Sequence, residues 1–120
     1  MSEKVNIVDR TYEFALDVIK LVNLLPRSTS GAVISNQIMK AGTSIGANVE
    51  EAQGAASKKD FTNKMSISKK EARETRYWLR LIKDSGTLKV VLVEDLLKEC
   101  NSILKILTAI VKTSKENTEK

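Results

Sequence analysis

The sequence predicts an all-α fold, an antiparallel up-down-up-down four-helix bundle, and three observations indicate it. Four segments carry apolar residues at alternating spacings of three and four, the period of an amphipathic helix. The joints between these segments are short, so consecutive helices should run antiparallel. Five glycines and one proline in 120 residues are too few for the many turns of a β-sandwich. A chain of this length can bury a core without metals or disulfides, so we expect one domain over residues 1–120.

The first helix is predicted over residues 5–25. Pro26 ends it, because the residue before a proline avoids the helical conformation. Apolar residues cover a broad arc of this helix in two neighbouring stripes. One stripe is Val5, Val8, Tyr12, Ala15, Ile19 and Val22, and the other is Ile7, Phe14, Val18, Leu21 and Leu25.

The second helix is predicted over residues 30–56, with its N-terminal cap at Ser28, Thr29 or Ser30. Glycine in a helix interior costs about 1 kcal/mol relative to alanine. Because Gly42 and Gly46 lie in the middle of this helix, we expect another helix to approach closely there. The residues predicted to face inward are Ile34, Ile38, Ala41, Ile45, Val49, Ala52 and Ala56.

The third and fourth helices are predicted over residues 59–84 and 90–112. Ser57 followed by Asp60 resembles a capping box at the start of the third helix, and Gly86 is suited to end it. The polar residues 112–120 are expected to fray. The predicted inward residues are Phe61, Met65, Ser68, Ala72, Thr75, Leu79 and Ile82 on the third helix, and Val93, Leu97, Cys100, Leu104, Leu107 and Val111 on the fourth.

The composition argues against an enzyme, a cofactor and a metal site. The chain has no histidine, which excludes Ser–His and Cys–His nucleophile pairs, His-ligated zinc and Glu-x-x-His di-iron sites. A polar cluster of Asn48, Glu51, Glu71 and Glu74 is better interpreted as ion pairs with neighbouring arginines than as an acid–base site.

The cellular setting predicted from the composition is the cytoplasm. Cys100, the one cysteine, cannot form an internal disulfide and is expected to be an inert core thiol. No apolar run reaches the roughly 20 residues that a membrane span needs, and the first residues do not form a cleavable apolar leader.

The third helix carries more apolar surface than one buried stripe requires. Aromatic and aliphatic residues outside the core stripe are typical of a partner surface. They predict a homo-oligomer; the other interpretation is that the aromatic residues cover an edge of their own bundle. The predicted oligomer contacts are Ile67, Tyr77, Trp78 and Leu81.

The net charge of +5 is concentrated in the third helix. Residues 58–80 contain eight Lys or Arg and three Asp or Glu, so this segment alone carries 8 − 3 = +5. Like charges three or four residues apart repel each other, which favours a stripe that meets an anion such as nucleic acid. The other interpretation is that Glu50, Glu51 or acids on the neighbouring helices pair with these cations. The predicted stripe is Lys58, Lys69, Arg73, Arg76, Arg80 and Lys83.

Two blocks of sequence carry a family resemblance. AGTSIGANVEEA at residues 41–52 and DFTNKMSISKKEARETRYWL at residues 60–79, with Leu24-Leu25-Pro26 and Gln37, resemble the four-helix-bundle proteins of the 23S rRNA intervening-sequence family. Lys40 stands where many members have arginine, which keeps the charge. The resemblance implies an antiparallel bundle assembled as a homopentamer and no established catalytic activity. Similar bundles are accessory proteins of diversity-generating retroelements, whose basic surface is held to engage nucleic acid and a reverse transcriptase.

Two functions therefore remain open from the sequence. The first is a non-enzymatic oligomeric bundle that binds RNA or DNA through the basic stripe. The second is an oligomeric scaffold or adaptor that binds another protein.

Overall fold

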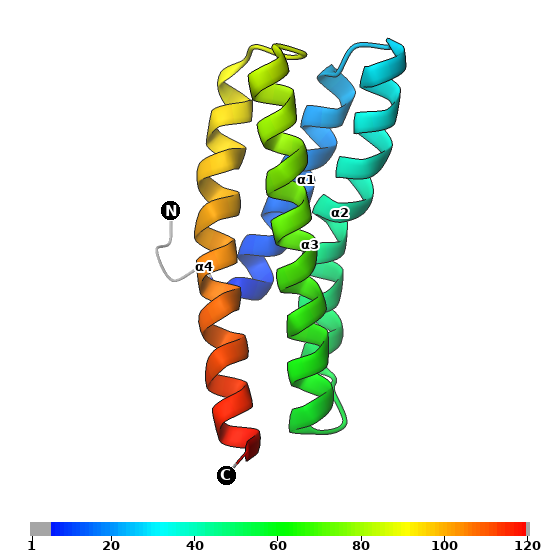
Figure 1. The fold of residues 1–120 in the computed structure, drawn as a ribbon. Helices are drawn as coiled ribbons and strands as arrows, with labels where there is room; N and C mark the ends of the chain where they lie inside the picture. The colour runs from blue at the N-terminus through cyan, green and yellow to red at the C-terminus, as the bar shows by residue number, and fades with distance from the viewer. Residues whose placement is uncertain (1–5, 120) are drawn as a thin grey trace.

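The computed structural model describes residues 6–119, which fold into an antiparallel bundle of four α-helices without strands (Figure 1). The helices are α1 (Ile7–Leu24), α2 (Thr29–Gln53), α3 (Lys58–Ser85) and α4 (Val91–Glu119). They run up, down, up and down in chain order, as the amphipathic periodicity predicts (Figure 1). The predicted fold class is therefore confirmed.

Each helix packs against two others in a closed order. Contacts join α1 to α2, α2 to α3, α3 to α4 and α4 back to α1, so α1 lies diagonally across the core from α3, and α2 from α4. The core between them is one apolar cluster to which all four helices contribute, for example Phe14, Ile38, Leu79 and Leu107. α3 and α1 therefore lie on opposite sides of this core.

Most residues predicted to face inward are buried. On α3 all of them are buried except Phe61, which is half-buried against the core. On α1 the stripe that contains Phe14 and Val18 faces the core. Tyr12 and Ile19, from the other α1 stripe, are exposed. The broad apolar arc of α1 is thus more than its own bundle covers.

The start of α2 and both ends of α3 are capped by residues that the sequence predicts. The Ser28 hydroxyl accepts from the Gly31 amide at 3.0 Å, which identifies Ser28 as the cap of α2. The Ser57 hydroxyl accepts from the Asp60 amide at 3.0 Å at the start of α3. At the end of α3, Gly86 has φ 71°, the left-handed conformation that glycine adopts without steric cost.

The two α2 glycines lie against α1. A β-carbon added to Gly42 would come within 2.9 Å of both γ-carbons of Val18. One added to Gly46 would lie 3.1 Å from the carbonyl oxygen of Thr11. The predicted close approach is therefore confirmed, and the partner helix is α1.

Two predicted boundaries are wrong. α2 ends at Gln53, three residues before the predicted end at 56, because Gly54 caps it and the chain turns toward the Ser57 cap of α3. Ala56, predicted to face inward, is exposed in this turn. α4 continues to Glu119 rather than ending near 112.

Within the extra turns of α4, Ser114 contacts α3. The Thr62 hydroxyl of α3 bonds to the Ser114 hydroxyl of α4, which holds the end of α4 to α3. The other boundaries agree within one or two residues, although Val5, the predicted start of the first helix, lies outside the described residues.

α1 is much shorter than its neighbours. At 1.5 Å per residue, its 18 residues span about 27 Å, whereas the 28 residues of α3 span about 42 Å. Within residues 6–119, one end of the bundle consequently contains α2, α3 and α4 without α1, as the lower part of Figure 1 shows.

None of the helices in residues 6–119 combines the length and apolar character that crossing a membrane requires.

Candidate nucleic-acid interface

Five of the six predicted cations line one flank of α3, beside α4. These residues fall within about 80° of the helix circumference, at 100° per residue. Two contacts show that this flank borders α4. Arg76 Nη1 donates to Asn101 Oδ1 at 3.5 Å, and Lys83 Nζ lies 3.4 Å from Glu94 Oε2. The five are Lys69, Arg73, Arg76, Arg80 and Lys83.

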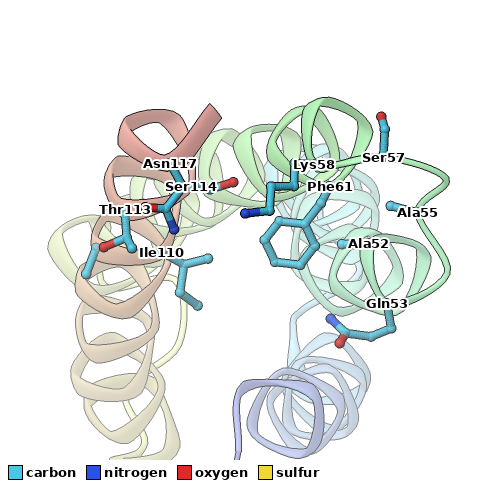
Figure 2. A pocket seen from close by; sticks show the side chains of 11 residues that line it. Ala52, Gln53, Ala55, Ser57, Lys58, Phe61, Ile110, Thr113, Ser114 and Asn117 are labelled. Atoms are coloured by element: carbon cyan, nitrogen blue, oxygen red, sulfur yellow. The ribbon is translucent and has the colours of Figure 1, made fainter. Parts of the chain in front are cut away.

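Lys58 falls on the same arc of α3 as the other five cations but lies eleven residues before Lys69. It is the first residue of α3 and lines a hollow at the three-helix end of the bundle. Figure 2 shows its side chain directed toward the space between α3 and α4. The continuous part of the stripe, with spacings of four and three residues, begins at Lys69.

Most of these cations form no ion pair with a carboxylate in the described part of the chain. In the described part of the chain, the ion pairs are Arg10–Glu99, Lys20–Asp17 and Lys83–Glu94. Of the predicted stripe only Lys83 is paired, so the alternative of a salt-bridged face holds for that residue alone.

The predicted polar cluster between α2 and α3 is not joined by such pairs either. Asn48 donates to the carbonyl of Ser44 at 2.8 Å within its own helix. Glu74 accepts from the indole N–H of Trp78 at 3.5 Å.

α4 adds a second row of cations that sequence reasoning missed. Lys98, Lys105 and Lys112 recur every seven residues, which places them on one side of a helix, and all three are exposed. Asn101, the partner of Arg76, comes three residues after Lys98 and four before Lys105, so the row shares the flank that borders α3.

The charge count of residues 81–120 conceals this row. Seven cations and six acids leave a net charge of only 7 − 6 = +1. Two of those acids are already engaged, since Glu94 pairs with Lys83 and Glu99 pairs with Arg10. A seven-residue spacing of lysines was the signal that could have revealed the row.

We call the two rows together the basic face. Seven of its eight cations have no carboxylate partner among residues 6–117. Along the axis of α3, the basic face extends from Lys83 to about the level of Met65, a length of roughly 27 Å at 1.5 Å per residue. Two adjacent rows of unpaired cations can contact successive phosphates, whereas the face has no aromatic residue on which a base could stack. The basic face consists of Lys69, Arg73, Arg76, Arg80 and Lys83 on α3 with Lys98, Lys105 and Lys112 on α4.

The predicted oligomer contacts divide into two kinds. Ile67, Tyr77 and Leu81 are exposed on the outside of α3, with Tyr77 54% accessible. Trp78 is half-buried and packs against the core, and its ring meets Tyr77 edge-on at a centroid distance of 5.0 Å. Trp78 therefore covers an edge of its own bundle, as the alternative interpretation had it, while the other three remain uncovered.

The hollow at the three-helix end measures about 670 Å³. Phe61 from α3 and Ile110 from α4 point into it, and amide and hydroxyl groups surround them (Figure 2). Its lining contains one ionisable side chain, Lys58, and no paired acid and base. It occupies the position that a longer α1 would fill.

Cys100 is buried between α3 and α4. Its Sγ donates to the carbonyl of Ala72 at 3.3 Å. Burial raises the pKa of the Cys100 thiol to about 12, against the opposing effect of the nearby Arg76 charge. The thiol consequently stays protonated and unreactive at neutral pH.

Arg10 links the first helix, α1, to the last helix, α4. Its guanidinium donates to both carboxylate oxygens of Glu99, at 3.0 and 2.7 Å, and to the Ser102 hydroxyl at 2.9 Å. The hydrogen bond to Glu99 raises the pKa of Arg10 above its ordinary value, although partial burial opposes this. These bonds hold α1 against α4. Because Glu99 pairs with Arg10, it does not pair with a cation of the basic face.

No arrangement of metal ligands is present in the part of the chain that the structure describes, where no three His, Cys, Asp or Glu side chains are grouped to hold an ion.

The chain has clear relatives among solved structures, whereas no curated protein matches it. A crystal structure of a protein of unknown function from the S23 ribosomal protein family of Bacteroides thetaiotaomicron is similar, with a TM-score of 0.83 and 38% sequence identity. The match covers 89% of this chain and 99% of that one. Residues 3–109 match the family described as 23S rRNA-intervening sequence protein. The four-helix bundle and this match over most of the chain show that the protein belongs to the 23S rRNA-intervening sequence protein family.

Proposed function

We propose that this protein is a non-enzymatic, cytoplasmic, homo-oligomeric bundle that binds RNA or DNA through its basic face. The supporting observation is that seven cations on adjoining flanks of α3 and α4 lack carboxylate partners among the side chains of residues 6–117. Like charges this close repel one another, and a polyanion relieves that repulsion while releasing its own counterions. The family resemblance further implies five copies, which would repeat the face around the assembly and multiply its field.

Binding of this kind reads the phosphate backbone and is insensitive to base sequence. If all seven unpaired cations of one subunit met duplex phosphates, log K would fall with log salt at a slope of about −6, from roughly 0.9 per contact. Partial engagement gives a proportionally smaller slope. The proposal therefore predicts strong salt dependence and little preference among random sequences.

The test is a salt series with random-sequence single-stranded RNA, single-stranded DNA and duplex DNA. Arg73→Gln/Arg80→Gln should reduce the duplex slope by about 1.8, because two phosphate contacts are lost. Lys20→Gln/Arg27→Gln, which removes two exposed cations outside the basic face, is the matched control and should leave the slope unchanged. A flat salt response, no binding at 50 mM salt, or equal losses in both double variants would refute the proposal.

A second candidate function is an oligomeric scaffold or adaptor that binds another protein. The observation that favours it is the uncovered apolar surface of α3 at Ile67, Tyr77 and Leu81. It predicts that Tyr77→Ala reduces assembly or capture of a protein partner while nucleic-acid affinity per subunit is unchanged. Loss of nucleic-acid affinity in that variant would argue against a separate protein-binding surface.

A further inference from the structure

The hollow at the three-helix end leaves apolar side chains uncovered. Phe61 of α3 and Ile110 of α4 pack on the core with one side and point into the hollow with the other (Figure 2). Ala52, Ala55 and Ala109 complete the apolar part of the lining. The volume of about 670 Å³ lies within the range of roughly 300–1,000 Å³ that small-molecule pockets have.

The size of the hollow favours a small molecule over the helix of a partner protein. α3 has 28 residues and α1 has 18, so within residues 6–119 about 28 − 18 = 10 residues of α3, roughly 15 Å, have no α1 beside them. A helix of that length and about 10 Å in diameter displaces about 1,200 Å³, nearly twice the volume of the hollow. Much of such a helix would stay in solvent, whereas a small molecule can be covered on most of its surface.

The charge of the hollow favours an anion. Lys58 is the one ionisable side chain in its lining, and Figure 2 shows it directed toward the space between α3 and α4. It has no ion-pair partner among the side chains of residues 6–117. α3 begins at this end while α2 and α4 end here, so the three helix dipoles sum to a partial charge of about −0.5. The unit charge of the Lys58 ammonium exceeds that sum.

Three other polar side chains of the lining are already engaged within the fold. The Gln53 amide donates to a carbonyl of its own helix at 2.9 Å, and the Ser57 hydroxyl accepts from the Asp60 amide at 3.0 Å. The Ser114 hydroxyl bonds to that of Thr62. An apolar lining with one charged group at its edge suits a ligand that has a hydrocarbon body and a single polar end.

We propose that this hollow binds a small amphipathic carboxylate from solution, with its hydrocarbon part on Phe61 and Ile110 and its carboxylate against Lys58. Removal of apolar surface from water supplies the affinity, and the ammonium group selects an anionic end over a neutral or cationic one. The site goes beyond the proposed nucleic-acid binding, because its lining shares no residue with the basic face.

The test is a nuclear magnetic resonance titration of the full chain with octanoate, 1-octanol and octylamine, which share a chain and differ in the charge of the polar end. Octanoate should shift the amide signals of the lining and bind about fivefold more tightly than 1-octanol, with octylamine weakest. Lys58→Gln should remove this preference. Lys59→Gln, at an exposed neighbour outside the lining, is the matched control and should keep it.

A second variant blocks the hollow without changing its charge. Ala109 is exposed and lines the hollow, so Ala109→Trp should fold and should abolish the octanoate shifts. Ala47→Trp, at an exposed position of α2 outside the lining, is the matched control and should leave them unchanged. Octanoate shifts that are absent, confined to the basic face, or unaltered in Ala109→Trp would overturn the inference, as would equal affinities for the three ligands.

Two further measurements detect a macromolecular occupant. A synthetic peptide of residues 7–24 that shifts the lining amides where octanoate does not would show that the hollow takes a helix. A smaller assembly of Ala109→Trp in size exclusion with light scattering would show that a second copy covers the hollow. Either result would overturn the inference. The salt dependence of nucleic-acid binding by Ala109→Trp should match that of the natural protein, so the two proposals can fail separately.

Discussion

Replacing Gly42 by alanine tests the packing of α1 on α2, because two opposing effects decide its sign. Alanine in a helix interior is about 1 kcal/mol more favourable than glycine. Here the added methyl would lie 2.9 Å from both γ-carbons of Val18, which is fully buried. Overpacking of this kind costs about 1–3 kcal/mol. We therefore expect Gly42→Ala to lower the free energy of unfolding by about 1 kcal/mol.

The clash can be assigned to Val18 with a double-mutant cycle. Val18→Ala alone should cost about 2 kcal/mol, because it removes two buried methyl groups and leaves a cavity. In the double variant the methyl of residue 42 occupies the vacated space, so the losses should not add. We expect a favourable coupling of about 1–2 kcal/mol between the two positions.

The assay is urea unfolding followed by circular dichroism, with the midpoint and slope fitted for each variant. Gly54→Ala is the matched control, since the nearest atom to its added β-carbon is the Glu51 carbonyl oxygen at 3.9 Å. That variant should be close to neutral. A stabilised Gly42→Ala, or strictly additive losses in the double variant, would refute the close contact between α1 and α2.

Three further predictions concern single residues. Because burial raises the pKa of the Cys100 thiol from 9.0 to about 12, the folded state keeps a proton that the unfolded state loses above pH 9. The thiol's contribution to stability is therefore full below pH 9 and declines as pH rises toward 12. In urea unfolding, the stability advantage of the natural protein over Cys100→Ala should shrink by up to about 1.4 kcal/mol per pH unit in this range. A difference in stability that stays constant with pH would contradict this. Gly86→Ala should cost about 1 kcal/mol, because φ is 71° there, and thermal unfolding with no change would show that the turn relaxes easily. Glu99→Gln should lower the free energy of unfolding by about 1 kcal/mol in urea, because the partly exposed double hydrogen bond from Arg10 would no longer have a charged acceptor. An equal cost in a background of Arg10→Gln would show that the pair contributes nothing to stability.

Local features of the fold were predictable because their causes lie within a few residues. The Ser57 hydroxyl and Asp60 amide are three positions apart, and the Gly86 stop needs only a residue that accepts positive φ. The glycines of α2 indicated a close helix, yet nothing in their spacing shows that the partner is α1, since that depends on the order in which the helices pack.

The misjudged boundaries have tertiary causes. Ala55 and Ala56 are good helix formers, so propensity alone carries α2 past Gly54. At the other end of the chain, polar composition suggested a frayed tail, whereas the Thr62–Ser114 bond and the helical propensity of the intervening residues continue α4 to Glu119.

The α3 row of the basic face could be predicted from the sequence, and the α4 row could not. The α3 row is visible as an excess of charge, while the α4 row is hidden by acids that turn out to be used by Arg10 and Lys83. The packing of neighbouring helices decides which acids remain free to pair with a row of cations. The periodicity of the sequence does not indicate that packing.

Because α1 is short, the two ends of the bundle should differ in their free energy of local unfolding. Where four helices meet, separating one exposes the whole core, but beyond the start of α1 the last turns of α4 rest mainly on α3. Amide protons there should exchange with solvent through local opening, at a free energy well below that of global unfolding. The far end of α4 can therefore loosen and re-form while Phe14, Ile38 and Leu107 stay packed, so the bundle has one rigid end and one yielding end.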